Sequence, residues 1–264
     1  MHLRKCRYKM IYKEINVDRI INKIVKKDNL FSGNYTVDPY QNCEFRCKYC
    51  DSSYSDTIFI KKNAVEIFEK DIKNIDKGRI IIGSVHDPYQ FVEKKYRLTR
   101  KILKIIKKNN FPVNIITKSN YVLEDIDLIS DIDDSIITIS IISLDKNITN
   151  IFEKNLPDSY ERLAIIKKIS EKNIKTILAI IPILPYITDK EINKILLKAD
   201  EYKAYKIVFK TLELKGDQKQ LFFNIIKDKY PELFKKYKKI YNDSFQPDDG
   251  YINKINKILN EKIK

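Results

Sequence analysis

The stretch Val37-Asp-Pro-Tyr-Gln-Asn-Cys43-Glu-Phe-Arg-Cys47-Lys-Tyr-Cys50 decides how the fold is interpreted. It places three of the four cysteines of the chain within eight residues, at C-x3-C-x2-C spacing. A short apolar run, residues 34–37, comes directly before it and predicts a strand that leads into the loop. Thiolates are soft ligands that suit iron-sulfur clusters or zinc, and three on one loop can hold three corners of a cubane. The stretch therefore predicts a strand followed by a metal-binding loop.

Two metal centres fit this spacing. In a cubane held by three thiolates, the fourth iron lacks a protein ligand and can bind a substrate or cofactor directly. The alternative is a structural zinc site completed by His86, Cys6 or a carboxylate. Zinc sites usually use paired C-x2-C knuckles from two places, and the sequence has no second pair, so the spacing favours the cluster. Cys6 stands apart in a basic N-terminal stretch and is interpreted as an incidental thiol.

Short apolar runs alternate with longer stretches of helical period through most of the chain, which is typical of repeated βα units around a parallel sheet. The runs are rich in β-branched residues, which suit strands that are buried on both faces. The expected strands are residues 34–37, 79–84, 113–117, 136–143, 175–181 and 206–212.

The intervening stretches carry apolar stripes at helical spacing, such as Leu163, Ile166 and Ile169. Parallel strands are joined by right-handed crossovers, so six strands with such helices predict an α/β fold, a partial (βα)6 TIM-like barrel. In such barrels the chemistry lies at the C-terminal ends of the strands, and the cysteines follow the first strand. We expect a basic N-terminal extension over residues 1–30, the barrel core over 31–215 and a helical C-terminal extension over 216–264 that packs on the core.

The chain of 264 residues has a net charge of +15, from 51 basic and 36 acidic residues. Residues 1–30 and 201–264 each carry a surplus of six positive charges. A basic shell of this kind attracts polyanions such as nucleic acid, although surplus lysine also serves solubility alone. A zinc-stabilised nucleic-acid-binding module without catalysis is therefore the alternative function. No apolar run approaches the ~20 residues that span a bilayer, which predicts a cytoplasmic protein without a membrane partner.

These motifs resemble the radical S-adenosylmethionine (SAM) superfamily, and within it the spore photoproduct lyase-like branch, often called DNA repair photolyases. The resemblance covers residues 30–200 and includes the aromatic Tyr49 before the last cysteine. The branch-level motifs are Asp38-Pro-Tyr-Gln-Asn-Cys43, Gly83-Ser-Val-His-Asp-Pro-Tyr-Gln90 with Glu93, Lys95-Tyr-Arg-Leu-Thr99, Thr117-Lys-Ser119, and Pro182-Ile-Leu-Pro185 followed by Asp189.

The resemblance implies a lyase-like enzyme in which Cys43, Cys47 and Cys50 bind a 4Fe-4S cluster and S-adenosylmethionine chelates the open iron. An electron from a donor such as ferredoxin or flavodoxin would cleave the sulfonium bond and give a 5'-deoxyadenosyl radical. That radical would abstract hydrogen from a substrate, for which a nucleic acid is one candidate. The cofactor supplies the chemistry and the protein positions it. No catalytic residue is assigned from the sequence.

The resemblance also implies which strand ends hold S-adenosylmethionine. The expected contacts are Tyr49, Gly83, Ser84, His86, Lys118 and Ser140. Tyr49 would pack by the adenine, Lys118 would pair with the methionine carboxylate, and Ser140 would lie near the ribose or methionine. Gly83, Ser84 and His86 would lie by the methionine amino group. Ser84 stands where spore photoproduct lyases carry a hydrogen-donating cysteine, which argues against thymine-dimer reversal by that route.

Overall fold

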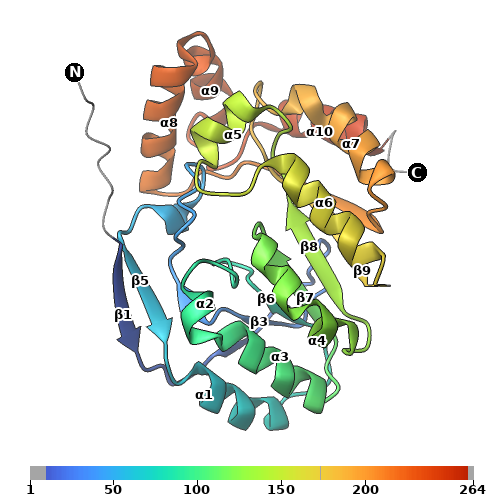
Figure 1. Cartoon of the computed structure of the whole chain (residues 1–264). Coiled ribbons are helices and arrows are strands. Elements are labelled where there is room, and N and C mark those ends of the chain that lie inside the picture. The colour runs from blue at the N-terminus through green and yellow to red at the C-terminus, as the bar shows by residue number, and fades with distance from the viewer. Residues whose placement is uncertain (1–9, 173, 261–264) are drawn as a thin grey trace, which may run out of the picture.

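The computed structural model describes residues 10–172 and 174–260 (Figure 1). Its main sheet has the order β10-β9-β8-β7-β6-β3-β2, and all neighbours are parallel except β2 and β3. The seven strands are β2 (Ile21–Lys23), β3 (Tyr35–Val37), β6 (Ile80–Ile82), β7 (Val113–Thr117), β8 (Ile136–Ser140), β9 (Lys175–Ile183) and β10 (Lys206–Thr211). Each of the six expected strands is present, and β2 and β10 form the two edges of the sheet. The α/β fold with an open, partial (βα)6 barrel is confirmed.

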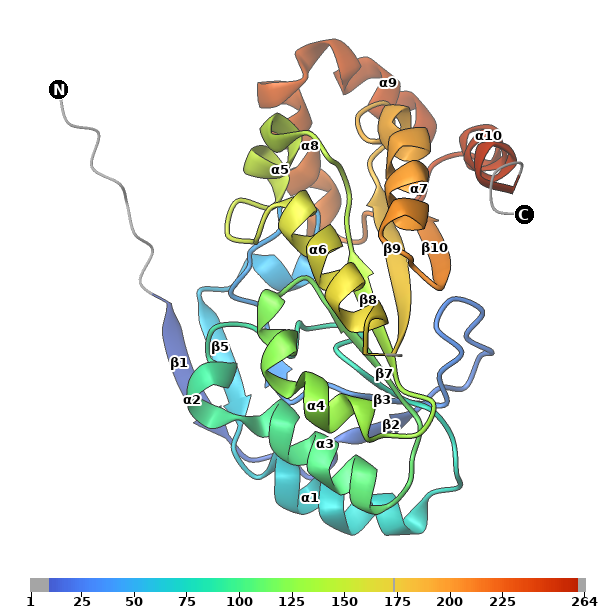
Figure 2. The same cartoon turned by 45° about the vertical axis from the view of Figure 1, so that its right-hand side comes forward.

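Helices lie on the outer face of this sheet (Figures 1 and 2). They are α1 (Ala64–Asp71), α3 (Leu98–Lys108), α4 (Ile126–Ser130), α6 (Ser159–Ser170) and α7 (Ile192–Glu201). Two further helices, α2 (Glu93–Tyr96) and α5 (Lys146–Phe152), lie in the connections after β6 and β8, and Phe152 of α5 packs with the cysteine loop. The stripe Leu163, Ile166 and Ile169 is fully buried in the main core, as the helical period predicts. A capping box between Asp158 and Glu161 starts α6 and satisfies free amide groups of its first turn.

A second, small sheet forms the base of the cysteine loop. It consists of β1 (Ile11–Ile15), β5 (Thr57–Lys61) and β4 (Tyr40–Gln41) in the order β1-β5-β4. The antiparallel pairing of β4 with β5 closes the loop of residues 42–56 at its base. Strands β1 and β2 both fall within the stretch for which an N-terminal extension is predicted, and they pair with β5 and β3.

The connection between β2 and β3 reaches the inner side of the open barrel. Leu30 and Phe31 pack there with Ile136, Ile177 and Val208, which come from β8, β9 and β10. Asp28 shapes this connection, because its carboxylate accepts the backbone N–H groups of Leu30 and Phe31 at 3.0 and 3.1 Å. Side chains from the loop thus occupy part of the space that a closed barrel would fill with strand residues.

Three helices follow β10: α8 (Asp217–Lys229), α9 (Phe234–Tyr241) and α10 (Asp249–Asn260). Helices α8 and α9 form a second apolar core together with the cysteine loop; it includes Phe222, Tyr237 and Tyr241 from the helices and Phe45 and Tyr49 from the loop. Short 3-10 helices also occur in the described part of the chain: η1 (Asp51–Ser53), η2 (Ile72–Asn74), η3 (Asn120–Asp125), η4 (Asp189–Glu191) and η5 (Pro231–Leu233). None of the helices in the described ranges combines the length and apolarity needed to cross a membrane.

Candidate active site

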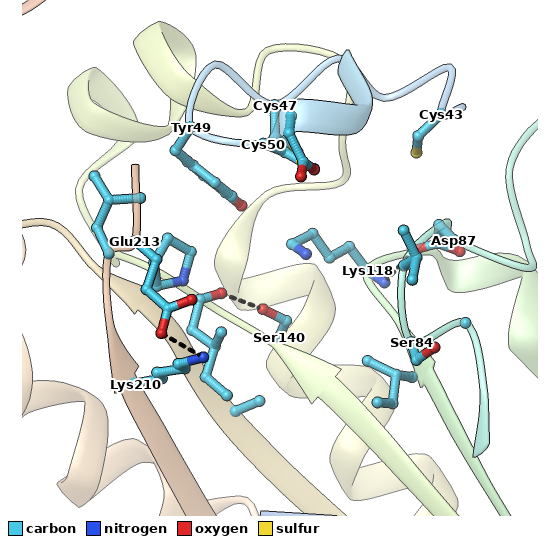
Figure 3. Close-up of a pocket in the computed structure, with 18 of the residues that line it drawn as sticks. Cys43, Cys47, Tyr49, Cys50, Ser84, Asp87, Lys118, Ser140, Lys210 and Glu213 are labelled. Atoms are coloured by element: carbon cyan, nitrogen blue, oxygen red, sulfur yellow. Dashed lines mark hydrogen bonds and ion pairs between the residues drawn. The ribbon is translucent and has the colours of Figure 1, made fainter. Parts of the chain in front are cut away.

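A cavity of about 430 Å³ opens at the C-terminal ends of the barrel strands (Figure 3). The cysteine loop forms one side of it, and the ends of β6 to β10 form the others. The predicted site residues on its wall are Cys43, Cys47, Tyr49, Cys50, Gly83, Ser84, Lys118 and Ser140. His86 is not part of this wall. Predicted residues from four separate segments therefore meet at the edge of the sheet where βα barrels carry their chemistry.

Local hydrogen bonds hold the cysteine loop in shape. The Asn42 side chain donates to the Thr57 carbonyl at 2.7 Å, and Cys43 N–H donates to the Ser52 carbonyl at 3.2 Å. A tight turn follows, in which Cys50 N–H donates to the Cys47 carbonyl at 3.0 Å. Asn42 takes a left-handed conformation, with φ 66°, that asparagine tolerates better than most residues. These bonds place all three thiols on the cavity side of the loop.

Burial controls the state of the thiols. Cys43 and Cys47 are buried and Cys50 is half-buried. Burial raises the pKa of Cys43 to about 12 and that of Cys47 well above its usual value. Backbone N–H groups of Phe45 and Asp87 donate to the Cys43 sulfur and oppose part of that rise. Without a bound cation the Cys43 and Cys47 thiols are protonated at neutral pH, so metal binding must displace protons there.

The donor set fits a cubane better than a single metal ion. Within the described ranges, no three His, Cys, Asp or Glu side chains converge closely enough to hold one ion. A mononuclear zinc site requires such convergence, whereas each thiolate of a cubane binds a different iron atom. His86 lies off the cavity wall, and Cys6 lies outside the described residues. The zinc-stabilised module is therefore unsupported, and three thiols on one loop suit a 4Fe-4S cluster with one open iron.

Lys118 and Asp87 lie opposite the cysteine loop (Figure 3). Burial disfavours the charge of Lys118, but the neighbouring Cys47, Glu153 and Asp87 outweigh burial and raise the pKa of Lys118. Asp87 accepts the Thr117 hydroxyl at 2.7 Å and the Lys118 backbone N–H at 2.8 Å. Burial raises the pKa of Asp87, and these hydrogen bonds oppose the rise. The cavity thus contains a lasting positive charge at Lys118.

Asp38, which follows β3, holds the loop after β6. Its carboxylate accepts the Ser84 hydroxyl at 3.2 Å and the backbone N–H groups of Val85 and His86 at 3.2 and 3.1 Å. The backbone of His86 is therefore fixed, while the buried Nδ1 atom of its half-buried ring has no hydrogen-bond partner among the described residues. Burial lowers the pKa of His86, which keeps the ring neutral at pH 7.

The sequence analysis assigned no role to Asp38, although a repeated motif in the sequence indicates one. The tetrapeptide Asp-Pro-Tyr-Gln occurs twice, at residues 38–41 and 87–90. In each copy the aspartate accepts backbone N–H groups from the loop that follows the next strand of the sheet. The repeat therefore marks two equivalent clamps between neighbouring loops.

Gly83 and Ser140 take positions that depend on their small side chains. Gly83 has φ +88°, and a Cβ atom there would come within 2.5 Å of the Ile116 carbonyl oxygen. The Ser140 hydroxyl donates to the Ile181 carbonyl at 2.9 Å, so its oxygen remains an acceptor toward the cavity. Both residues line the cavity at the strand ends.

The end of β10 adds charged residues that sequence reasoning missed. Glu213 pairs with Lys210 at 2.8 Å and with Lys215 at 3.2 Å, and all three line the cavity (Figure 3). These lysines could not be singled out among 51 basic residues, because only the fold shows which ones lie beside the cavity. Phe31, from the connection between β2 and β3, lines the same cavity.

Comparisons with known proteins agree with this architecture. The profile of the Radical SAM superfamily matches residues 37–199, which is more than half of the chain. The uncharacterized protein MJ0683 of Methanocaldococcus jannaschii is 28% identical over 222 residues, which cover 80% of this chain and 82% of the relative.

Two solved structures share the fold. A spore photoproduct lyase complexed with dinucleoside spore photoproduct aligns with a TM-score of 0.64 and 16% identity, over 86% of this chain and 69% of that one. SuiB of Streptococcus suis bound to S-adenosylmethionine aligns with a TM-score of 0.54 and 12% identity, over 76% and 47% of the two chains. With three thiols beside a cavity at the strand ends and a family profile over most of the barrel, the chain belongs to the radical SAM superfamily, whose enzymes use a 4Fe-4S cluster and S-adenosylmethionine.

Proposed function

We propose that Cys43, Cys47 and Cys50 bind the 4Fe-4S cluster, that S-adenosylmethionine occupies the adjoining cavity, and that the substrate is a nucleic acid. The observation that carries the proposal is the presence of all three thiols on one wall of a cavity that also contains Lys118. When bound, the cluster and S-adenosylmethionine supply a 5'-deoxyadenosyl radical for hydrogen abstraction. An electron donor such as ferredoxin or flavodoxin completes the system.

Each cavity residue has a distinct task in this proposal. Lys118 stays protonated and pairs with the methionine carboxylate. Gly83 lines the cavity with its backbone beside the methionine end, and Ser84 offers a hydroxyl acceptor for the methionine amino group. The Ser140 oxygen accepts a hydrogen bond from the ribose. His86 acts through its backbone, which Asp38 holds, and its ring is not a contact.

Tyr49 and the second apolar core protect the chemistry. Tyr49 is 5% exposed and lines the cavity, where its ring can pack beside the adenine. Phe152 and Phe222, stacked at 5.8 Å, belong to the apolar core that encloses the cysteine loop. This cover keeps water away from the site and so limits quenching of a reactive species.

Two observations support a nucleic acid as the substrate. Lys210 and Lys215 stand on the cavity wall and the chain carries a net charge of +15, which favours a polyanion. The spore photoproduct lyase of similar fold was solved with a dinucleoside.

The described residues include no thiol beyond the three of the cysteine loop, and Ser84 has too strong an O–H bond to return a hydrogen atom. The reaction proposed here therefore differs from thiol-assisted dimer reversal.

Anaerobic reconstitution tests the cofactor assignment. With iron and sulfide, the wild type should gain cluster absorbance and convert S-adenosylmethionine and dithionite to 5'-deoxyadenosine. Cys47→Ala should lose both signals, whereas Asp131→Asn, an exposed change on the outer side of the barrel, should retain them. One tightly bound zinc per chain with no sulfide would overturn the assignment.

Oligonucleotide binding tests the substrate class. Affinity for single-stranded oligonucleotides should fall steeply with salt, and a Lys210→Ala/Lys215→Ala variant should reduce the salt slope by about two. Lys107→Ala, on the far end of α3, is the matched control. Affinity that does not respond to salt or to the two substitutions would favour a peptide or small metabolite as substrate.

A further inference from the structure

A buried ion pair stands directly behind Tyr49. The Tyr49 hydroxyl donates to Glu153, and Glu153 pairs with Arg162 at 2.5 Å. Both charged side chains are fully buried, at 0% exposure. Arg162 also donates to the Ser140 carbonyl at 2.7 Å. One chain of contacts therefore joins the cysteine loop to the end of β8, which lines the same cavity.

Two further hydrogen bonds hold the backbone of the cysteine loop near Tyr49. The backbone N–H of Lys48 donates to the Phe152 carbonyl at 2.9 Å, and the side chain of Gln218 donates to the Tyr49 carbonyl. Gln218 is itself buried in the first turn of α8. The segment between Cys47 and Cys50 is thus tied by its backbone from two sides, and the Tyr49 side chain adds a third attachment, to Glu153.

Charges are a costly way to hold a loop. Removing Glu153 and Arg162 from water carries a large desolvation penalty, and apolar side chains of similar volume often serve stability as well or better. The Nε atom of Arg162 even has no hydrogen-bond partner among the described residues. We therefore expect these two charges to serve a purpose other than the stability of the fold. Both act electrostatically on the cysteine loop, since Cys47 interacts with Glu153 and with Arg162.

We infer that the Glu153–Arg162 pair positions Tyr49 and the segment between Cys47 and Cys50, and that each of its two charges offsets the effect of the other on the reduction potential of the cluster. The inference rests on the proposed role of the three cysteines as cluster ligands. Reduction adds a negative charge to the cluster, so a nearby positive charge favours reduction and a nearby negative charge opposes it. Because the two charges are paired, each cancels most of the effect of the other.

Redox titration of reconstituted protein tests this inference with a readout other than activity. Glu153→Gln keeps the shape of the side chain but leaves Arg162 unbalanced, so the midpoint potential should shift in the positive direction. Arg162→Gln leaves Glu153 unbalanced, so the potential should shift in the negative direction. The double variant should return close to the wild-type potential. If neither charge acted on the cluster, all three variants would have the wild-type potential.

Controls separate this inference from the proposed function. Tyr49→Phe removes the hydroxyl attachment without changing a charge, so it should alter the shape of the electron paramagnetic resonance signal and leave the potential near that of the wild type. Asp131→Asn should change neither. Circular dichroism checks that each variant is folded. If Arg162→Gln does not fold, the midpoint potential of Glu153→Gln alone tests the inference. Unchanged potentials, or shifts of the same sign, would overturn the inference. Failure of the wild type to assemble any cluster would instead overturn the proposed function.

Discussion

The carboxylate of Asp87 accepts the backbone N–H of Lys118 at 2.8 Å, and this bond joins the loop after β6 to the loop after β7. Asp38 makes the equivalent connection one strand earlier, to His86. Neighbouring loops at the mouth of the barrel are therefore linked in series. The position of the Lys118 charge depends on a carboxylate from another βα unit.

Asp87→Asn should loosen this link. The amide keeps the size of the side chain, but its NH2 group must face one of the donors that Asp87 now accepts, Thr117 Oγ1, Lys118 N or Tyr89 N. A buried donor left without an acceptor costs about 1–3 kcal/mol of unfolding free energy. Urea denaturation measures this change, with the exposed Asp133→Asn as the control. Equal stability of Asp87→Asn and the wild type would show that the clamp contributes nothing.

Lys118→Met should weaken binding of S-adenosylmethionine while it leaves the fold intact. A hydrogen bond to a charged group contributes about 1.5–3 kcal/mol, which corresponds to a Kd raised ~10- to 100-fold. Isothermal titration of anaerobically reconstituted protein gives the Kd directly. Lys107→Met removes an exposed lysine elsewhere and should bind as the wild type does. An unchanged Kd for Lys118→Met would remove this residue from the cofactor site.

Glu93 should make the stability of the protein depend on pH. Burial raises the pKa of Glu93 to about 7, although Tyr40 and the backbone N–H groups of Thr99 and Arg100 donate to it. The folded state therefore holds this proton more tightly than the unfolded state, whose pKa is near 4.5. The stabilisation is complete below pH 4.5 and is lost as the pH rises to about 7.

The size of this effect follows from the two pKa values and reaches at most about 3 kcal/mol. Glu93→Gln cannot titrate, so its unfolding free energy should fall less than that of the wild type between pH 5 and pH 7. Urea denaturation at pH 5, 6, 7 and 8 gives the comparison. Parallel curves for the two proteins would mean that Glu93 is ionised throughout this range.

Phe222→Ala should expose the cysteine loop. Phe222 is fully buried in the second apolar core and stacks on Phe152, whose carbonyl accepts the Lys48 N–H. Truncation of a buried phenylalanine costs about 3–5 kcal/mol of unfolding free energy. The cluster of the reconstituted variant should also be lost faster in air than that of the wild type. The decay of the cluster absorbance measures this loss. Leu197→Ala, at a position 73% exposed, is the control that should do neither.

Sequence reasoning found the barrel because most of its six parallel strands are apolar, β-branched and buried on both faces. Ile80, Ile81 and Ile82 of β6, for example, are all buried. Strand β1 escaped prediction for the opposite reason, since four of its five residues are exposed and only pairing with β5 defines it. The pattern of apolar residues therefore reveals strands whose side chains are buried. It does not reveal an exposed strand such as β1, which exists because it pairs with a neighbouring strand.

The residues of the candidate site could be predicted where they are close together in the sequence, and they could not be predicted where they are far apart in it. The cysteines and Tyr49 lie within eight residues, and their spacing alone indicates a metal centre. Glu153 and Arg162 lie more than 100 residues further along the chain, and nothing in their own surroundings connects them to Tyr49. His86 shows the converse, because this histidine lies within a motif of the site but does not line the cavity.

The contact between Gln218 and Tyr49 sets an order of events during biosynthesis. Helix α8 emerges from the ribosome about 170 residues after the cysteines, so the nascent loop stays uncovered while the rest of the barrel is made. Iron and sulfide can be delivered to it during that interval. Once α8 and α9 dock, they cover one side of the loop, and later repair of a damaged cluster is left to the cavity that all three cysteines line.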